Sequence, residues 1–403
     1  MKNLISKKVK QMQPSGIRAF FDLVLGMKDV ISLGVGEPDF VTPWPIREAG
    51  IYSLEQGFTS YTSNKGLMKL RLGISRYLKD KFGLDYSPQD QILITVGVSE
   101  AFDLCLRAVI NQGDRILTPT PSFVSYGPLV ELAGGVPVYI DTKENNFKLT
   151  PQMLEKHINK RCKALVLNYP ANPTGVSYTR KELEAINKVL MRHNLLCISD
   201  EIYGDLTYDF EHTAFAALNK AKNRTIYLNG FSKSYAMTGW RVGYACGQRE
   251  IIAAMTKIHQ YTIMCVSITS QMAACEALSH SGQRAVNDMK REYFRRREYI
   301  VSELNRIGLG CAKPDGAFYV FASVKNTGLA AIDFASRLLK QQHVAVVPGT
   351  AFGPCDDYIR ISYASSMDNI KEAVTRIEKF LTTNASLRAP HSGLLAMTGD
   401  LYA

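Results

Sequence analysis

Lys233 lies between two apolar runs that are typical of buried strands, in a segment of small, hydroxylic and aromatic residues. Burial there would disfavour the charged ammonium and lower its pKa. An amine of this kind can form an imine with an aldehyde. Ser232 and Arg241 could hold an anionic group beside it, so an aldehyde that carries a phosphate would fit. A solvated lysine in a turn is the alternative interpretation.

Asp200 ends another apolar run, residues 195–199. A carboxylate at the end of a buried strand could hold a protonated pyridine nitrogen away from water, but aspartate is also a common N-cap of helices. Asn172 lies in residues 168–175, where two prolines and a glycine restrict the turn. That rigidity would direct the Asn172 amide into the same crevice, although the segment could also be a plain loop.

The elements that must position these residues alternate between apolar strand-like runs and helical patterns, which predicts parallel βαβ units. We expect strands at residues 91–96, 115–117, 136–140, 164–168, 195–199, 225–228 and 241–245. We expect helices at residues 102–110, 124–132, 151–157 and 181–193. The predicted fold is therefore α/β, with a mostly parallel seven-stranded sheet between helices. Ligands bind at the carboxyl ends of such strands, where the candidate residues fall.

The chain divides into four predicted parts. Residues 1–45 form an N-terminal segment, with a helical pattern at residues 17–25, that packs with the small domain. Residues 46–285 form the large domain, and residues 286–384 form a small α+β domain. Its expected elements are residues 317–321, 333–339, 344–347, 358–362 and 369–381. Residues 385–403 have no sustained period and are expected to be a disordered tail.

Composition indicates an ordinary globular protein, with 403 residues, 46% hydrophobic and 21% charged. Without an apolar run long enough for a signal peptide or a membrane span, we expect a cytoplasmic protein with no membrane contact. The eight cysteines lack a CxxC pair and the seven histidines are scattered, so no metal site is expected. The net charge of +11 could indicate nucleic acid, but the densest basic run, Arg291 to Arg297, is interleaved with glutamates. A solvated helix face is the preferred interpretation, with no nucleic-acid partner.

Several motifs occur together in one order: residues 34–40, 168–175, 199–203, 229–243 and 358–364. Together they resemble the pyridoxal-phosphate-dependent class I aminotransferases of fold type I, with the strongest similarity to the aspartate/aromatic aminotransferase branch. The resemblance spans about residues 12–383. It implies pyridoxal 5'-phosphate as cofactor and a homodimer with shared active sites.

The resemblance also implies roles for individual residues. Lys233 would form the imine with the cofactor and later move the proton at the substrate α-carbon. Asp200 would hold the pyridine nitrogen, and Tyr203 and Asn172 would bond the ring's phenolic oxygen. Phe123 would stack on the ring, although a core position is the simpler interpretation of a phenylalanine.

The remaining implied roles concern anions. The cofactor phosphate would be held by the backbone of Ser99 and Glu100, by Ser232, by Arg241 and by Tyr61 of a neighbouring subunit. Arg360 would bind the substrate carboxylate with its planar fork, whereas the alternative is a surface arginine on an edge strand. Gly36 would let backbone close over the same carboxylate.

The predicted function is an aminotransferase that moves the amino group of an α-amino acid, aspartate or aromatic, to a 2-oxo acid such as 2-oxoglutarate by a ping-pong mechanism. A β-lyase on the same fold is the nearest alternative. A non-catalytic regulator that binds the cofactor is another.

Overall fold

The structure is a computed structural model that describes residues 4–12, 14, 27 and 29–384. Within these residues, the central sheet has seven strands. In spatial order they are β2 (Ile92–Thr95), β8 (Gly243–Cys246), β7 (Thr225–Gly230), β6 (Leu196–Asp200), β5 (Cys162–Asn168), β3 (Arg115–Thr120) and β4 (Val136–Asp141). Neighbouring strands run parallel except at β8, which is antiparallel to β2 and to β7. The mostly parallel seven-stranded sheet predicted from the sequence is confirmed.

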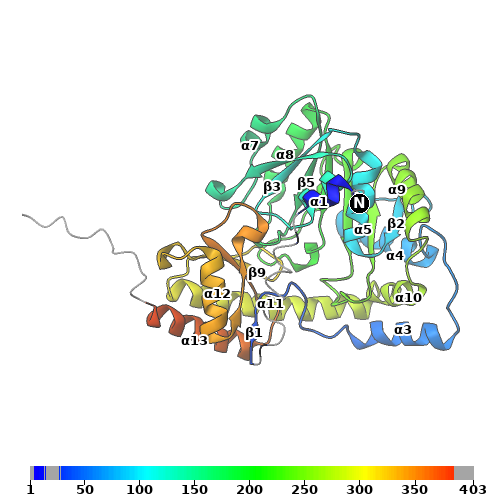
Figure 1. The fold of residues 1–403 in the computed structure, drawn as a ribbon. Coiled ribbons are helices and arrows are strands. Elements are labelled where there is room, and N and C mark those ends of the chain that lie inside the picture. The colour runs from blue at the N-terminus through cyan, green and yellow to red at the C-terminus, as the bar shows by residue number, and fades with distance from the viewer. Residues whose placement is uncertain (1–3, 13, 15–26, 28, 385–403) are drawn as a thin grey trace, which may run out of the picture.

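Helices cover both faces of this sheet (Figure 1). One face packs against α5 (Gly97–Val109), α6 (Tyr126–Leu132) and α9 (Arg249–Thr262). The other packs against α4 (Met68–Phe82), α7 (Pro151–His157), α8 (Arg180–Arg192) and α10 (Ile268–Ala277). On β5, Ala164 and Val166 belong to the first core while Leu165 and Leu167 belong to the second. Because successive strand residues point to opposite faces and both faces are buried at β5, its central residues form a continuous apolar run.

The helix that follows β2 begins earlier than predicted. We expected a helix at residues 102–110, whereas α5 already begins at Gly97, which has a φ of +70°. Gly97 and Ser99 interrupt the apolar pattern, which is why the periodicity gave a start that was too late. The helix N-terminus therefore follows directly on β2, and its free backbone N–H groups lie at the carboxyl end of the sheet.

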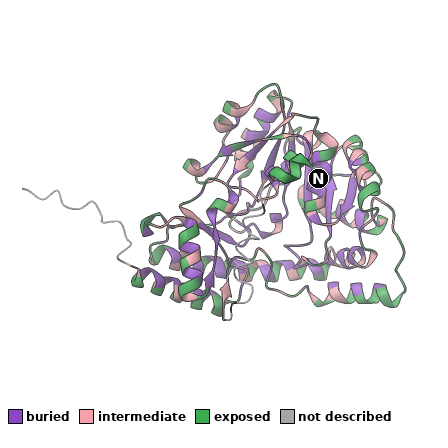
Figure 2. Ribbon diagram, in the orientation of Figure 1, coloured by how far each residue is buried: buried purple, intermediate pink, exposed green. Residues whose placement is uncertain are grey.

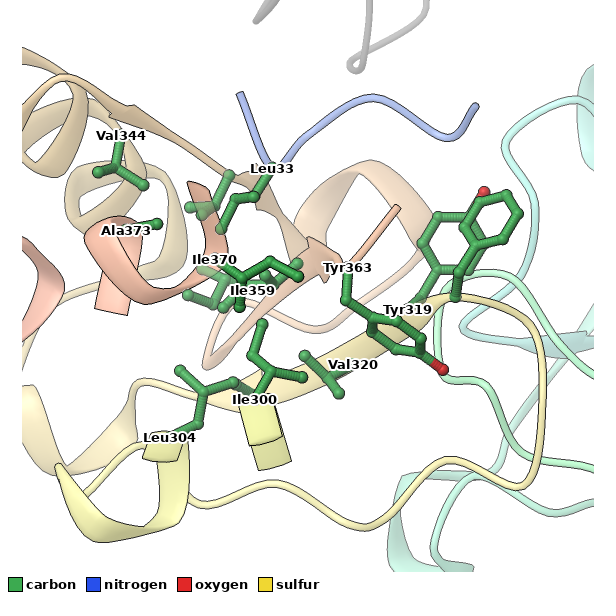
Figure 3. Close-up of a cluster of buried hydrophobic side chains, with 14 of the residues drawn as sticks. Leu33, Ile300, Leu304, Tyr319, Val320, Val344, Ile359, Tyr363, Ile370 and Ala373 are labelled. Carbon is green, nitrogen blue, oxygen red and sulfur yellow. The ribbon is translucent and has the colours of Figure 1, made fainter. Parts of the chain in front are cut away.

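The small domain contains an antiparallel sheet in the order β11 (Val347–Pro348), β12 (Tyr358–Ser362), β9 (Tyr319–Ser323). Its core includes residues of α12 (Ala331–Gln342) and α13 (Met367–Thr383). Figure 3 shows Ile370 and Ala373 of α13 in this core. The strand expected at residues 344–347 is divided. Its first half, β10 (Val344–Ala345), pairs in parallel with β1 (Ile31–Ser32), while β11 pairs with β12.

A long helix, α11 (His280–Arg306), runs from the large domain to the small one (Figure 1, yellow). Near it, α3 (Trp44–Glu55) packs on α10 and was not predicted, because its apolar residues do not lie on one face: Ile46 is buried while Ile51 is exposed. The short helix α1 (Lys7–Gln11) contacts α6. Short 3-10 turns occur at Lys143–Asn145, Gly204–Leu206, Phe215–Ala217, Lys222–Arg224, Lys325–Thr327 and Gly349–Phe352.

Buried residues fill the sheet and the inner sides of its helices (Figure 2). The eight cysteines are free thiols. In the described part of the chain, no helix is long and apolar enough to cross a membrane, and no group of three or more His, Cys, Asp or Glu side chains could hold a metal ion. The helix expected at residues 17–25 and the tail at residues 385–403 lie outside the described residues.

Candidate active site

A cavity of about 350 Å³ lies at the carboxyl ends of the large sheet, and both domains contribute residues to it. All but two of the residues singled out from the sequence line this cavity: Gly36, Ser99, Phe123, Asn172, Asp200, Tyr203, Ser232, Lys233, Arg241 and Arg360. These residues are far apart in the sequence. They meet because parallel strands end at one edge of a sheet and because β12 of the small domain faces that edge.

Lys233 follows the end of β7 and is partly buried. Its Nζ donates to the carbonyl oxygen of Gly36 at 2.7 Å and lies 6.0 Å from the centroid of the Tyr203 ring. Loss of hydration lowers the pKa of Lys233 to about 8, and the positive charges of Arg360 and Arg241 act in the same direction, against the opposing charge of Glu37. The amine is therefore uncharged more often than an ordinary lysine, as imine chemistry requires.

Asp200 is the last residue of β6 and is buried. Burial raises its pKa to about 6, against the effect of two donors. Its Oδ2 accepts a hydrogen bond from the Tyr126 hydroxyl at 2.7 Å, and its Oδ1 accepts one from the Ile202 N–H at 3.2 Å. A buried carboxylate of this kind gains most from a partner that brings a proton or a positive charge.

Arg360 lies on β12 and is buried. Its Nη1 donates to Asn172 Oδ1 at 2.9 Å and its Nη2 donates to the Gly34 carbonyl oxygen at 2.5 Å, while its Nε has no hydrogen-bond partner in the described part of the chain. The guanidinium lies 4.6 Å from the Tyr319 ring centroid and 4.9 Å from that of Phe352. Among the described residues no carboxylate pairs with Arg360, so a buried cation faces the cavity. The alternative of a surface arginine is wrong.

Tyr203 and Asn172 line the same cavity as Arg360. The Tyr203 hydroxyl is 2.8 Å from the hydroxyl of Tyr319. Asn172 is held in place because its N–H donates to Asn168 Oδ1 at 3.0 Å. Phe123 lies just before α6 and lines the cavity. Its ring packs edge-on against the ring of Tyr126, with 5.7 Å between the ring centroids.

A candidate anion site lies where α5 begins. Ser99, Ser232 and Arg241 line the cavity there, and Arg241 Nη1 donates to the Thr238 carbonyl oxygen at 3.0 Å. A Cβ on Gly97 would lie 2.8 Å from Arg241 Nη2, so only glycine lets the helix N-terminus and the guanidinium approach this closely. Helix N–H groups, hydroxyls and a permanent cation together suit a phosphate.

Glu100 and Tyr61 are the two predicted residues outside the lining of the cavity. The Glu100 carboxylate accepts from the Val96 N–H at 2.5 Å and from His259 Nδ1 at 2.7 Å, so its side chain ties α9 to the start of α5. Only its backbone remains available for a phosphate. Tyr61 is 81% exposed on the surface beyond α3.

Sequence reasoning missed two tyrosines. Tyr126 bonds Asp200, and it was visible only as the last residue of a motif at residues 121–126. Tyr319 lines the cavity beside Tyr203 and Arg360, and nothing in its apolar strand marked it as functional. The contacts of both depend on elements that are distant in the sequence.

The residues present fit pyridoxal 5'-phosphate. Lys233 offers an amine of lowered pKa, and Asp200 offers a buried acceptor. Gly97 and Arg241 leave a space for a phosphate that a Cβ on residue 97 would partly fill. Arg360 adds a buried cation whose Nε lacks a hydrogen-bond partner among the residues that the structure describes.

Comparison with known proteins agrees with this geometry. The family described as aminotransferase class I and II matches residues 28–377. A putative aminotransferase of Bacillus subtilis is 49% identical over 94% of this chain and 99% of its own, and an aspartate aminotransferase of Pyrococcus abyssi is 44% identical over 94% and 98%. The crystal structure of an aromatic aminotransferase from Pyrococcus horikoshii superposes with a TM-score of 0.87 at 42% identity, covering 92% of this chain and 100% of the other. The chain therefore belongs to the class I and II aminotransferases, which are transferases of fold type I that use pyridoxal phosphate.

Proposed function

We propose that this aminotransferase moves the amino group of an aspartate or an aromatic amino acid to a 2-oxo acid such as 2-oxoglutarate, in two half-reactions of a ping-pong mechanism. The observation that carries the proposal is one cavity that combines the amine of Lys233, the buried carboxylate of Asp200 and the buried cation of Arg360. Relatives that are named aspartate and aromatic aminotransferases support the two classes of donor.

When bound, the cofactor supplies an aldehyde and an electron-withdrawing ring. Lys233 would hold the aldehyde through its amine, and the same amine would move the proton at the substrate α-carbon. Asp200 keeps a proton on the ring nitrogen, and Tyr126 holds the Asp200 carboxylate in place from 2.7 Å. Tyr203 and Asn172 bond the phenolic oxygen and favour its ionised form.

Binding and orientation fall to the other residues. Phe123 packs on the ring face. Ser99, Ser232 and Arg241 hold the phosphate together with the backbone of Glu100. Arg360 binds the substrate carboxylate with its fork, and the backbone at Gly36 covers that carboxylate. Gly36 lies close to Tyr319, since a Cβ there would be 2.6 Å from the Tyr319 hydroxyl.

A second copy of the chain completes the site in this proposal. Tyr61 is 81% exposed, and exposed apolar residues gather nearby on and after α3: Trp44, Ile51, Tyr52, Leu54 and Phe58. A partner that covers this surface would bring its Tyr61 to the phosphate of the first copy. The eight free cysteines suit a cytoplasmic location.

The test is a half-reaction experiment on the purified holoenzyme. Each amino acid is added alone while the cofactor absorbance is followed, and 2-oxoglutarate is then added to restore it. Release of ammonia and pyruvate instead would identify a β-lyase. Borohydride reduction followed by peptide mass spectrometry should place the cofactor on Lys233, and any other lysine would overturn the assignment.

A further inference from the structure

Tyr319 joins three parts of the candidate site. It is fully buried at the start of β9, and its hydroxyl lies 2.8 Å from the hydroxyl of Tyr203. Its ring centroid lies 4.6 Å from the guanidinium carbon of Arg360. The backbone of Gly36 passes so close that a Cβ there would be 2.6 Å from the Tyr319 hydroxyl.

The register of the small sheet explains why Tyr319 meets Arg360. Tyr319 pairs with Ser362 across the antiparallel strands β9 and β12. Arg360 lies two residues before Ser362 and therefore on the same face of β12. Diagonal neighbours of this kind are within reach of an aromatic ring, and the negative face of the ring attracts the guanidinium.

The proposed role of Tyr203 requires that Tyr319 be the donor in the hydrogen bond between the two hydroxyls. Within the described residues, Tyr319 is the one hydrogen-bond partner of the Tyr203 hydroxyl. A tyrosine hydroxyl has a single proton, so Tyr203 can donate to a cofactor only if it accepts from Tyr319. A hydroxyl that accepts a hydrogen bond also becomes a stronger donor.

We propose that Tyr319 is a positioning residue that couples the substrate carboxylate site to the cofactor ring, by directing the Tyr203 proton with its hydroxyl and seating Arg360 with its ring. The inference rests on the proposed function, which gives Tyr203 and Arg360 their roles. In this inference the Tyr319 hydroxyl acts on the cofactor through Tyr203, and the Tyr319 ring acts on the substrate through Arg360.

Two variants of the holoenzyme test these parts. Tyr319→Phe keeps the ring and removes the hydroxyl, whereas Tyr319→Leu removes both. Tyr363→Phe is the matched control, because Tyr363 is also fully buried at the same end of the small-domain core (Figure 3). It loses a comparable hydrogen bond, which its hydroxyl donates to the Ala317 carbonyl oxygen at 3.1 Å, but it does not line the cavity.

The first readout is the pH midpoint of the absorbance change of the bound cofactor. Weaker donation by Tyr203 leaves more negative charge on the conjugated ring system, so its imine nitrogen becomes more basic. We expect both Tyr319 variants to raise the midpoint by about one unit, the equivalent of one hydrogen bond. The second readout is KM. We expect Tyr319→Phe to leave it within about twofold and Tyr319→Leu to raise it about tenfold for every amino acid.

Two results would overturn the inference: a midpoint in Tyr319→Phe that stays level with that of Tyr363→Phe or moves down, or a KM in Tyr319→Leu that equals the wild-type value. The proposed function fails differently, since wild-type protein would then carry the reduced cofactor on a lysine other than Lys233. Thermal unfolding of all three variants shows whether a shift merely follows lost stability, which would also count against the coupling.

Discussion

Replacing Arg360 with alanine should abolish recognition of the substrate carboxylate. The guanidinium now donates to Asn172 Oδ1 at 2.9 Å and to the Gly34 carbonyl oxygen at 2.5 Å, both of which are neutral acceptors. A carboxylate would accept from the same fork as a charged partner, and each such bond contributes about 1.5–3 kcal/mol. Because the bonds to Asn172 and Gly34 are given up in exchange, we expect a net loss of about 3 kcal/mol, or roughly 10²-fold in kcat/KM.

The assay compares an aromatic amino acid with the amine that lacks its carboxylate, both in the half-reaction. Wild-type protein should prefer the amino acid strongly, and Arg360→Ala should lose that preference while its rate with the amine changes little. Arg297→Ala is the control for deleting a buried arginine. Arg297 lies on α11 and is equally buried, but it donates to Asp209 and to the Pro314 carbonyl oxygen and does not line the cavity.

The reasoning is refuted if Arg360→Ala still discriminates between acid and amine as the wild type does. It is also refuted if the loss depends on which amino acid is tested, because a carboxylate contact is common to all of them. A matching loss in Arg297→Ala would mean that stability, not recognition, was measured.

Two further predictions concern ionisation in the cofactor-free protein. The pKa of Lys233 is about 8 against an ordinary 10.5, so the folded chain binds fewer protons between these values and stability rises with pH through that window. Lys233→Met has no such titration, so the free energy of unfolding of the wild type should rise relative to that of the variant by about 3 kcal/mol between pH 8 and pH 10.5. The hydrogen bond of Lys233 to Gly36 adds an offset that does not depend on pH in this window. Urea titrations that give the same difference at both pH values would contradict this. Tyr126→Phe removes a hydrogen bond to ionised Asp200, whose pKa is about 6, and should raise that pKa by about one unit. On acidification, cofactor affinity should then begin to fall at higher pH in the variant, and coincident binding profiles would exclude the role of Tyr126.

Most of the large sheet could be predicted from the sequence because its inner strands, such as β5 and β6, are buried on both faces. Apolar runs such as residues 164–168 and 195–199 are therefore unbroken, and helices separate them at the spacing of parallel units. Elements with a less regular apolar pattern were predicted less well. The helix α3 exposes Ile51 and buries Ile46, and the run at residues 344–347 pairs with two different partners.

The candidate site was predictable to the extent that its residues follow strands. Asp200 is the last residue of β6 and Lys233 follows the end of β7, and the topology brings these strand ends together. Arg360 lies in the middle of β12, and it reaches the cavity because β12 faces the same edge of the large sheet. Hydrogen bonds between side chains were not predictable in the same way. The pairs Tyr126–Asp200 and Tyr203–Tyr319 join elements whose relative position is set only by the packed core.

The pairing of β1 with β10 has a consequence for biosynthesis. The core of the small domain includes Leu33, near the start of the chain, and Ile359 and Ile377, near its end. A ribosome must therefore make the whole large domain, and then α13, before Leu33 can reach its partners. The large domain can fold meanwhile, since domains generally fold as units during synthesis. For that interval the early segment has exposed apolar residues, which makes the nascent chain a natural client for chaperones.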